Sequence, residues 1–304
     1  MKGLVMRSTG SFYDVLGDDG QHYNCRVRGK MRLDDIRETN PVAVGDRVTI
    51  DTEHSVGSIV EILPRRNHML RQSVKKTGHA HALAANIDQL VIIATLAFPR
   101  TSLGFIDRAL ISAEAFGIPQ VVVFNKKDLL NDEGIEIFGS LKQLYSRIDV
   151  GCSLISALDG EQAAIREILQ DKTSLITGHS GVGKSTLLNR ISPLISQSTG
   201  IVSDFSKKGT HTTTFAEMFQ LDEKTFVIDT PGIKEWGIVS MSSGELSDYF
   251  PEMRVLRQYC KFQSRCVHIS EPHCAIRDAV EAGSIASSRY ESYVSILSGS
   301  DNRK

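Results

Sequence analysis

The spacing of hydrophobic and polar positions divides the chain into three parts. The first seventy residues alternate the two in short runs separated by turn residues, at about 3–8, 11–16, 21–28, 46–51 and 57–63. Alternation with a period of two is typical of half-buried strands. Five short strands in so few residues predict a small closed β-barrel, and the OB type is the commonest nucleic-acid binder of that class.

The middle of the chain alternates buried strands with amphipathic helices. Residues 87–95 and 121–124 are near-continuous apolar runs, as expected of parallel strands buried on both faces. Between them, residues 105–116 carry apolar side chains at helical spacing, and Gly117 follows as a stop. Further strands are expected at 150–156, 174–177, 215–221 and 225–229. The order predicts an α/β sheet that binds ligands at its strand ends.

After Trp236 the pattern becomes mainly helical, over about 243–258 and 276–297. We therefore expect a multidomain protein of three units. These are an OB-type barrel over residues 1–68, an α/β nucleotide domain over 69–240 and a helical unit over 241–304.

The most specific motif is the segment GHSGVGKS, which fits the phosphate-loop pattern G-x-x-x-x-G-K-[ST]. It lies between an expected strand and an expected helix, so that backbone amides and a helix N-terminus face the phosphates. Lys184 supplies charge to the outer phosphates, and the Ser185 hydroxyl is placed to reach Mg²⁺. The residues expected to hold the phosphates are Gly178, His179, Ser180, Gly181, Val182, Gly183, Lys184, Ser185 and Thr186.

Two shorter motifs indicate which base is bound. Asn125, Lys126, Lys127 and Asp128 follow the apolar strand at 121–124. A carboxylate such as Asp128 can accept from both the ring N–H and the exocyclic amine of guanine, whereas adenine lacks that pair of donors. Asn125 is expected to brace the loop and the Lys126 stem to cover the base. After the next strand come Ser156 and Ala157, where a backbone amide is expected to meet the guanine carbonyl.

A second strand end carries the residues expected at Mg²⁺ and the γ-phosphate. In the segment DTPG, Asp229 is expected to hold Mg²⁺ through water, and the Gly232 N–H to sense the γ-phosphate. A threonine-rich stretch at 209–215 is expected to add one hydroxyl to Mg²⁺, from Thr213 or else from Thr212.

One position bears on the rate of hydrolysis. Ile233 occupies the place of a water-orienting glutamine, and a hydrophobic side chain cannot position water. We therefore expect slow intrinsic hydrolysis that a partner stimulates. His211 is a candidate base, with an ordinary loop residue as the alternative interpretation.

The order of these motifs is rotated relative to small GTPases, in which the phosphate loop comes first. Here the base-recognition motifs precede it, so the domain resembles circularly permuted GTPases. Rotation is physically permissible because a sheet can be re-cut at a surface loop without losing its contacts. Two other classes remain open: a phosphate-loop ATPase or small-molecule kinase, and a non-hydrolysing, nucleotide-regulated RNA-binding adaptor.

The last unit contains a cluster with the composition of a metal site: Cys260, Cys266, His268 and Cys274. Three thiolates and one imidazole would complete a closed tetrahedral site of the structural zinc type. His273 could compete as a ligand, and buried thiols without metal are the alternative. Of the five cysteines, these three cluster and the other two stand alone, and in a reducing compartment such a cluster indicates metal before disulfide.

RNA contacts are suggested by local patches only, because the net charge is −1. Basic residues recur at every second position from 26 to 32 and would share one face of an extended segment, near Tyr13 or Tyr23. The alternative is a charged, solvated edge strand. A basic stretch at 65–81 is interpreted as a connector that could also lie on RNA. The candidate RNA contacts are Arg26, Arg28, Lys30, Arg32, Lys75 and Lys76.

Composition indicates which class of protein and which cellular location to expect. With 41% hydrophobic residues the chain can bury real cores. It has no apolar run of membrane-spanning length and no apolar signal-peptide core, so we expect a cytoplasmic protein with no membrane partner, monomeric by default.

The sequence motifs together resemble the RsgA (YjeQ) family of bacterial GTPases that depend on the small ribosomal subunit. The resemblance covers nearly the whole chain, through VGDRVTI, AANIDQLVII, NKKD, GHSGVGKSTLLN, HTTT, DTPGIKEWG and CAIRDAVEAG. Two positions depart from the pattern: five residues separate the first two cysteines of the cluster where four are usual, and Thr210 stands where arginine is common. The resemblance implies a late-stage assembly factor that binds 16S rRNA, hydrolyses GTP when the subunit stimulates it, and then leaves.

Overall fold

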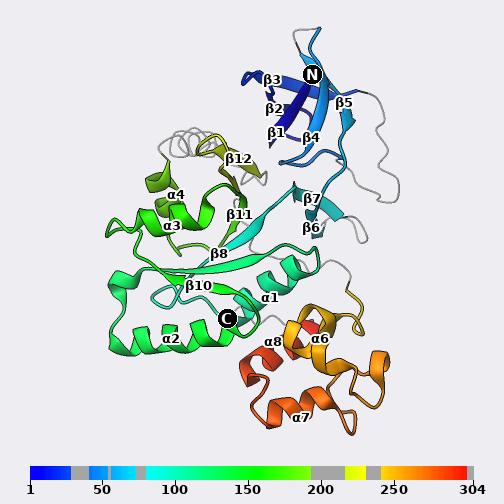
Figure 1. Ribbon diagram of the computed structural model, residues 1–304, viewed down its shortest axis with the longest axis vertical. Coiled ribbons are helices and arrows are strands. Elements are labelled where there is room, and N and C mark those ends of the chain that lie inside the picture. Colours follow the sequence, from blue (N-terminus) through cyan, green and yellow to red (C-terminus); the bar gives the residue numbers. More distant parts are fainter. Residues whose placement is uncertain (29–40, 54–55, 73–79, 193–215, 231–240, 300–304) are drawn as a thin grey trace, which may run out of the picture.

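A computed structural model describes the chain except for residues 29–40, 54–55, 73–79, 193–215, 231–240 and 300–304. Three parts follow one another along its long axis (Figure 1). The N-terminal barrel lies at one end, an α/β domain in the middle and a helical unit at the other end, which confirms the predicted fold class.

The barrel is built from the five predicted strands: β1 (Lys2–Ser8), β2 (Tyr13–Gly17), β3 (His22–Val27), β4 (Arg47–Asp51) and β5 (Gly57–Ile62). Their order is β1-β2-β3-β5-β4, and β4 pairs back with β1 to close the sheet. Alternate residues point inward, so that Val5, Val15 and Ile59 are fully buried. Closure removes the free edges that an open sheet of this size would expose.

The position of Tyr13 corrects one expectation. Its side chain is buried in the barrel core, so of the two tyrosines expected near the basic face Tyr13 cannot stack on a base. Tyr23 is partly exposed, and its hydroxyl donates to Asp19 Oδ2 over 2.7 Å.

The basic stretch at 65–81 is not simply a connector, as we had interpreted it. It contributes strand β6 (His68–Gln72) and the start of β7 (Ala80–Ala85), which pair antiparallel as a hairpin. Arg65 fastens this hairpin to the barrel, because its guanidinium lies 2.7 Å from the buried carboxylate of Asp46. The Ala85 N–H also donates to the Val44 carbonyl over 2.8 Å.

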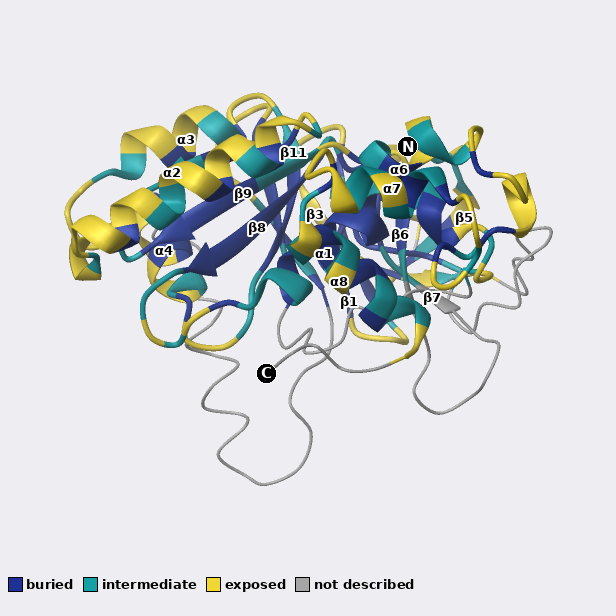
Figure 2. Ribbon diagram, turned by 90° about the horizontal axis from the view of Figure 1, so that it is seen from below, coloured by how far each residue is buried: buried dark blue, intermediate teal, exposed yellow. Residues whose placement is uncertain are grey.

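The central sheet has the predicted parallel character. Its strands are β10 (Gly151–Leu154), β9 (Gln120–Asn125), β8 (Gln89–Thr95), β11 (Thr173–Thr177) and β13 (Phe226–Asp229), with β12 (Glu217–Gln220) antiparallel beside β13. Successive residues of β8 face opposite cores. One core packs against α1 (Leu103–Glu114) and α2 (Asp132–Ser146), the other against α3 (Gln162–Leu169) and α4 (Lys184–Ile191). Strands β8 and β9 are accordingly buried throughout most of their length (Figure 2).

The barrel and the central sheet are joined edge to edge. Strand β12 pairs antiparallel with β1, with Arg7 opposite Glu217. The Arg7 Nη1 and Glu217 Oε1 atoms lie 3.8 Å apart across this junction. The eleven strands therefore form one continuous hydrogen-bonded sheet.

The C-terminal unit is more divided than predicted. The helix expected at 243–258 is broken into η2 (Leu246–Tyr249) and α6 (Pro251–Arg257), because Pro251 lacks the N–H that continuation needs and starts a new helix instead. After η3 (Gln263–Arg265), the helix expected at 276–297 is also two helices, α7 (Ala275–Glu281) and α8 (Ser287–Leu297). Gly283, with φ of +73°, ends the first of them.

A buried ion cluster anchors this unit on the central domain. Arg289 of α8 contacts Asp107 of α1 and Glu252 of α6, each over 2.7 Å. The Tyr145 hydroxyl donates to the same Asp107 oxygen over 3.1 Å. Arg289 and Asp107 are almost fully buried, and removing one partner of such a pair typically costs about 3–5 kcal/mol. The anchor therefore fixes where the C-terminal unit sits relative to α1.

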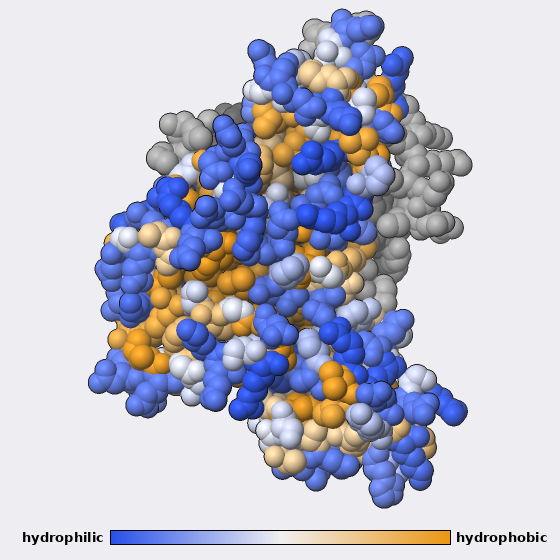
Figure 3. Space-filling view, in the orientation of Figure 1, coloured by the Kyte–Doolittle hydropathy of each residue, from blue (hydrophilic) through white to orange (hydrophobic). Residues whose placement is uncertain are grey.

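Hydrophilic residues cover much of the face shown in Figure 3, and hydrophobic residues show mainly over the central domain. Among the helices that the structure describes, none combines the length and apolar character needed to cross a bilayer.

Candidate nucleotide site and metal centre

The predicted nucleotide motifs meet at one edge of the central sheet. Because β8, β9, β10, β11 and β13 run parallel, their carboxyl ends share that edge. Strand β9 ends at Asn125, β11 runs into Gly178, and β13 ends at Asp229. Ser156 lies two residues after the end of β10. Segments that are far apart in the sequence are thus neighbours in space.

The side-chain amide of Asn125 joins three of these motifs. Its Nδ2 donates to the Val182 carbonyl in the phosphate loop over 2.8 Å, and its Oδ1 accepts the Ala157 N–H over 3.0 Å. The side chain is buried, with 2% of the residue exposed, so both bonds form away from competing water. Asn125 therefore braces its own loop, as expected, and also holds the other two.

Glycines allow the phosphate loop to lie close to its neighbours. Gly183 has φ of +88°, and a Cβ there would lie 2.4 Å from Asn125 Nδ2. At Gly178 a Cβ would lie 2.6 Å from the Ile93 carbonyl oxygen. Helix α4 begins directly after Gly183, and no side chain caps its first amides. Uncapped amides at a helix N-terminus are donors suited to an anionic group such as a phosphate.

The charged groups of the phosphate site are paired with each other. Lys184 Nζ forms an ion pair with Asp229 Oδ1, and each side chain is about one-seventh exposed (14% and 13%). The first is the residue expected at the outer phosphates and the second the one expected at Mg²⁺. Their contact shows that the phosphate loop and the β13 strand end belong to one site.

His179 of the phosphate loop is held by a residue that the sequence did not reveal. Its Nε2 lies 2.7 Å from Thr101 Oγ1, and its ring meets Phe105 edge-on at 5.7 Å between centroids. The same Thr101 oxygen accepts the Thr95 N–H over 2.9 Å. No motif marks Thr101, because its partner is 78 residues away.

The base-recognition residues form a second group beside the phosphate loop. Asp128 lies in η1 (Lys127–Leu129), and its Oδ1 accepts the Ser156 hydroxyl over 2.6 Å. Lys126 has φ of +67°, and its Nζ donates to the Phe98 carbonyl over 2.9 Å. The structure thus brings Asp128 and Ser156 together, while the Lys126 amine is directed to a neighbouring loop.

The amides expected to meet the guanine carbonyl already have acceptors in the protein. The Ala157 N–H donates to Asn125, and the Ser156 N–H donates to Glu161 Oε2 over 2.8 Å. The N–H groups of Leu158 and Asp159 both lie 3.2 Å from the Ser156 hydroxyl oxygen. A guanine carbonyl at this loop would have to share the Ala157 amide with Asn125.

Glu161 is a second residue that the sequence analysis missed. Its other carboxylate oxygen, Oε1, lies 2.7 Å from Lys127 Nζ. The hydrogen bond from Lys127, followed by that from the Ser156 N–H, lowers the pKa of Glu161. The same contact raises the pKa of Lys127. Glu161 therefore stays ionised at neutral pH between the two loops that are expected to read the base.

Several predicted residues lie outside the described part of the chain. In the nucleotide domain these are His211, Thr212, Thr213, Gly232 and Ile233, and among the candidate RNA contacts they are Lys30, Arg32, Lys75 and Lys76. Of the residues in the predicted basic face, the structure describes Arg26 and Arg28, and both are exposed. The Arg26 guanidinium lies 4.1 Å from the Phe12 ring centroid, and Arg28 Nη1 lies 3.3 Å from Asp51 Oδ2.

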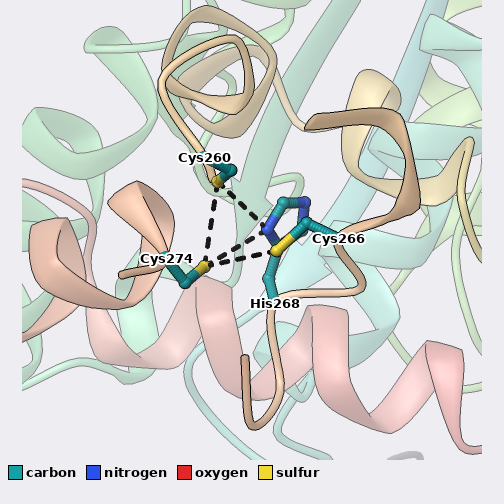
Figure 4. A group of neighbouring side chains, drawn as sticks. All are labelled: Cys260, Cys266, His268 and Cys274. Atoms are coloured by element: carbon teal, nitrogen blue, oxygen red, sulfur yellow. Dashed lines mark hydrogen bonds between the residues drawn. The ribbon is translucent and has the colours of Figure 1, made fainter. Parts of the chain in front are cut away.

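The cysteine–histidine cluster of the C-terminal unit has the geometry of a metal site (Figure 4). Its four ligand atoms all lie within 4.8 Å of one another, and all four residues are buried. The thiol of Cys274 is 3.9 Å from that of Cys260, 3.8 Å from that of Cys266 and 3.3 Å from His268 Nδ1. Zn–S bonds of about 2.3 Å in a tetrahedron place sulfurs about 3.8 Å apart, so the donors fit one zinc ion.

The surrounding structure holds the backbone of the loop that carries His268, and the cluster geometry decides between the two candidate histidines. His268 belongs to the cluster, whereas His273 is exposed and outside it. The Tyr290 hydroxyl donates to the His268 carbonyl over 2.6 Å. Glu271 accepts the amides of Val267, Ile269 and Ser270 in the same loop, and these bonds hold its pKa at about 2.

Known proteins resemble this chain in sequence and in fold. Residues 62–239 match the RsgA GTPase family, and residues 2–60 match the RsgA N-terminal domain. The small ribosomal subunit biogenesis GTPase RsgA of Christiangramia forsetii is 45% identical over 307 aligned residues, which cover 99% of this chain and 97% of the relative. The protein of the same name from Cytophaga hutchinsonii is 47% identical, with full coverage of both chains.

Solved structures agree with these matches. YjeQ from Thermotoga maritima superposes with a TM-score of 0.77 at 32% identity, covering 100% of this chain and 99% of that one. YloQ, described as a circularly permuted GTPase, superposes with a TM-score of 0.74 at 30% identity, covering 100% and 96%. The rotated motif order predicted from the sequence is therefore confirmed.

Replacing Gly183 by alanine tests the contact between Asn125 and the phosphate loop. The new methyl group meets Asn125 Nδ2 at 2.4 Å, and alanine is strained at φ of +88°. We expect the loop to relieve this strain by moving away from its nucleotide-binding position. A cost of about 1–3 kcal/mol then corresponds to a loss of GDP affinity of about fivefold to 150-fold. Titration with a fluorescent GDP analogue measures that loss.

Gly139→Ala is the matched control. Gly139 is exposed in α2, and no heavy atom lies within 4 Å of the added Cβ. We expect this variant to bind GDP as the unaltered protein does. Equal GDP affinity of the two alanine variants would show that the tight approach of Gly183 to Asn125 is unimportant for binding.

Proposed function

Because this chain belongs to the RsgA GTPase family, we propose that it hydrolyses GTP as a late-stage assembly factor of the small ribosomal subunit. The observation that carries the proposal is the position of Asn125, which joins the base-recognition loop, the phosphate loop and the Ser156–Ala157 loop. A bound nucleotide would touch all three. Without that convergence the motifs would be unrelated loops.

In the proposed complex each motif has one task. Asp128 accepts the ring N–H and the 2-amino group of guanine, and the Lys126 stem covers the base. The amides of the phosphate loop and the first turn of α4 hold the phosphates. Lys184 would leave Asp229 for the outer phosphates. Ser185 and Asp229 would hold Mg²⁺, which would supply positive charge against the phosphate oxygens.

The hydrolytic step is proposed to be slow without a partner. Ile233 offers no group to orient water, and Thr213, or else Thr212, is proposed to complete the Mg²⁺ site. The Gly232 amide is proposed to sense the γ-phosphate, and His211 remains the candidate base. Hydrolysis stimulated by the small subunit would then trigger release of the factor.

The barrel is proposed to contribute RNA contacts. Arg26 and Arg28 are exposed, and they are proposed to form one RNA-binding surface on 16S rRNA together with Lys30, Arg32, Lys75 and Lys76. Contacts of lysine and arginine with phosphates give salt-dependent binding that tolerates sequence change. We further propose a cytoplasmic monomer with domains at 1–68, 69–240 and 241–304. The two family matches divide the chain somewhat earlier, between residues 60 and 62, and the second match ends at residue 239.

The cluster of Cys260, Cys266, His268 and Cys274 is proposed to hold one structural zinc ion. The site is closed, because four protein donors fill a tetrahedron and leave no position for substrate. Zinc would tie the start of α7 to the loop after α6, since Cys274 precedes α7 and Cys260 follows α6. Its role would be folding of the unit that α8 anchors on the central domain.

GTP turnover with and without purified small ribosomal subunits tests the proposal. We expect slow hydrolysis by the protein alone and stimulation by at least about tenfold with the subunits. No turnover in either case would favour the non-hydrolysing adaptor. A basal rate that subunits do not change would contradict the proposed partner.

Asp128→Asn is the control that identifies the base. Loss of the carboxylate should reduce the preference for GTP over ATP by about tenfold or more, because bonds to a charged acceptor contribute about 1.5–3 kcal/mol. Competition binding in the same preparation measures this preference. Equal affinity of the unaltered protein for the two nucleotides would instead favour an ATPase or kinase.

Elemental analysis tests the zinc site. We expect one zinc per chain and its loss in Cys266→Ala, with unfolding of the C-terminal unit followed by limited proteolysis. Cys152→Ala is the control, because Cys152 is also buried but lies in the central domain outside the cluster. Less than half a zinc per unaltered chain, or zinc retained by Cys266→Ala, would contradict the assignment.

A further inference from the structure

Glu161 contacts both base-recognition loops although it belongs to neither motif. It directly precedes α3, and it caps none of the helix amides with its side chain. Its Oε2 accepts the Ser156 N–H over 2.8 Å, and its Oε1 lies 2.7 Å from Lys127 Nζ. One carboxylate thus spans the loop after β9 and the loop after β10.

The two arms of this carboxylate differ in environment. Ser156 is 1% exposed, so its N–H needs an acceptor within the protein, and an ionised one forms a strong, charge-assisted bond. The side chains of Lys127 and Glu161 are 46% and 33% exposed, and ion pairs at such positions contribute little. The Ser156 arm is therefore the one that can fix loop geometry.

Ser156 passes this constraint to Asp128. A hydroxyl has one proton to donate, and that of Ser156 goes to Asp128 Oδ1 over 2.6 Å. If the Ser156 backbone shifts, the hydroxyl can no longer hold the Asp128 carboxylate in the same orientation. The chain of contacts therefore runs from Glu161 through Ser156 to the group proposed to read guanine.

We propose that Glu161 is a positioning residue for guanine recognition, which acts by holding Ser156 and through it the Asp128 carboxylate. This rests on the proposed function, because it requires that Asp128 binds the base. This role of Glu161 has a specific consequence for base selectivity. Alignment of Asp128 governs how strongly the protein prefers guanine over hypoxanthine, which keeps the ring N–H and the carbonyl but lacks the 2-amino group.

The test compares the affinities of the full-length protein for GDP and IDP. Glu161→Ala should reduce the preference for GDP over IDP by about threefold to tenfold, because the 2-amino contact is no longer aligned. Glu167→Ala removes an exposed carboxylate of α3 that lies outside the nucleotide motifs, and it should keep the preference within about twofold. Glu161→Gln retains an acceptor for the Ser156 N–H and should keep most of the preference for GDP over IDP.

A double-variant cycle distinguishes positioning from general stabilisation. Ser156→Ala should show the same loss as Glu161→Ala, and the double variant should lose no more than Ser156→Ala alone, because both residues act along one path. If Glu161→Ala does not fold, Glu161→Met keeps the side-chain length without its acceptors and gives the same readout. A lowered melting temperature with an unchanged preference for GDP over IDP would overturn the inference.

Failure of the underlying function gives a different result. It would be seen in the unaltered protein, as equal affinities for GDP and ADP, and it would remove the inference together with the function. A protein that prefers GDP to ADP while Glu161→Ala behaves like Glu167→Ala keeps the function and rejects the role of Glu161.

Discussion

The two hydrogen bonds of the Asn125 side chain are the constraint on which the nucleotide site depends. They join residues separated by 57 positions on one side and 32 on the other, so local sequence cannot supply the contact. A buried amide that loses one of these partners is left with an unsatisfied polar atom, which typically costs about 1–3 kcal/mol. Because the bonds act through space, the order in which the chain supplies the loops is immaterial. This explains how base-recognition motifs that precede the phosphate loop can still form one site with it.

The flanking units attach to elements that adjoin this site. The barrel is bonded through β1 to β12, and β12 pairs with β13, which ends at Asp229. The C-terminal unit is anchored through Arg289 to Asp107 on α1. Just before α1 begins, Thr101 holds His179 of the phosphate loop. Both flanking units therefore contact elements whose ends reach the nucleotide site, an arrangement suited to a protein whose nucleotide state must be read by a large partner.

The parts of the molecule that follow local rules were predictable from the sequence. The barrel strands, the parallel sheet and the cysteine–histidine cluster each follow from spacing, and helix α1 ends near Gly117 as expected. The features that were not predicted depend on contacts between residues far apart in the sequence, or on a single residue that interrupts a helix. Arg289 lies 182 residues from Asp107, and Glu161 is recognisable only once the loops of Lys127 and Ser156 are side by side. Pro251 is a helix breaker inside the helical pattern, and it divides the helix expected at 243–258 into η2 and α6.

The central claim is that these loops form one guanine-nucleotide pocket, in which Lys184 exchanges Asp229 for the phosphates. A crystal structure of the full-length protein with GDP and Mg²⁺ tests it most directly. We expect the phosphates on the amides of residues 178–185, Lys184 turned from Asp229 to the β-phosphate, and the guanine edge against Asp128. A nucleotide bound elsewhere, or a guanine edge that does not contact Asp128 while Lys184 stays on Asp229, would contradict it.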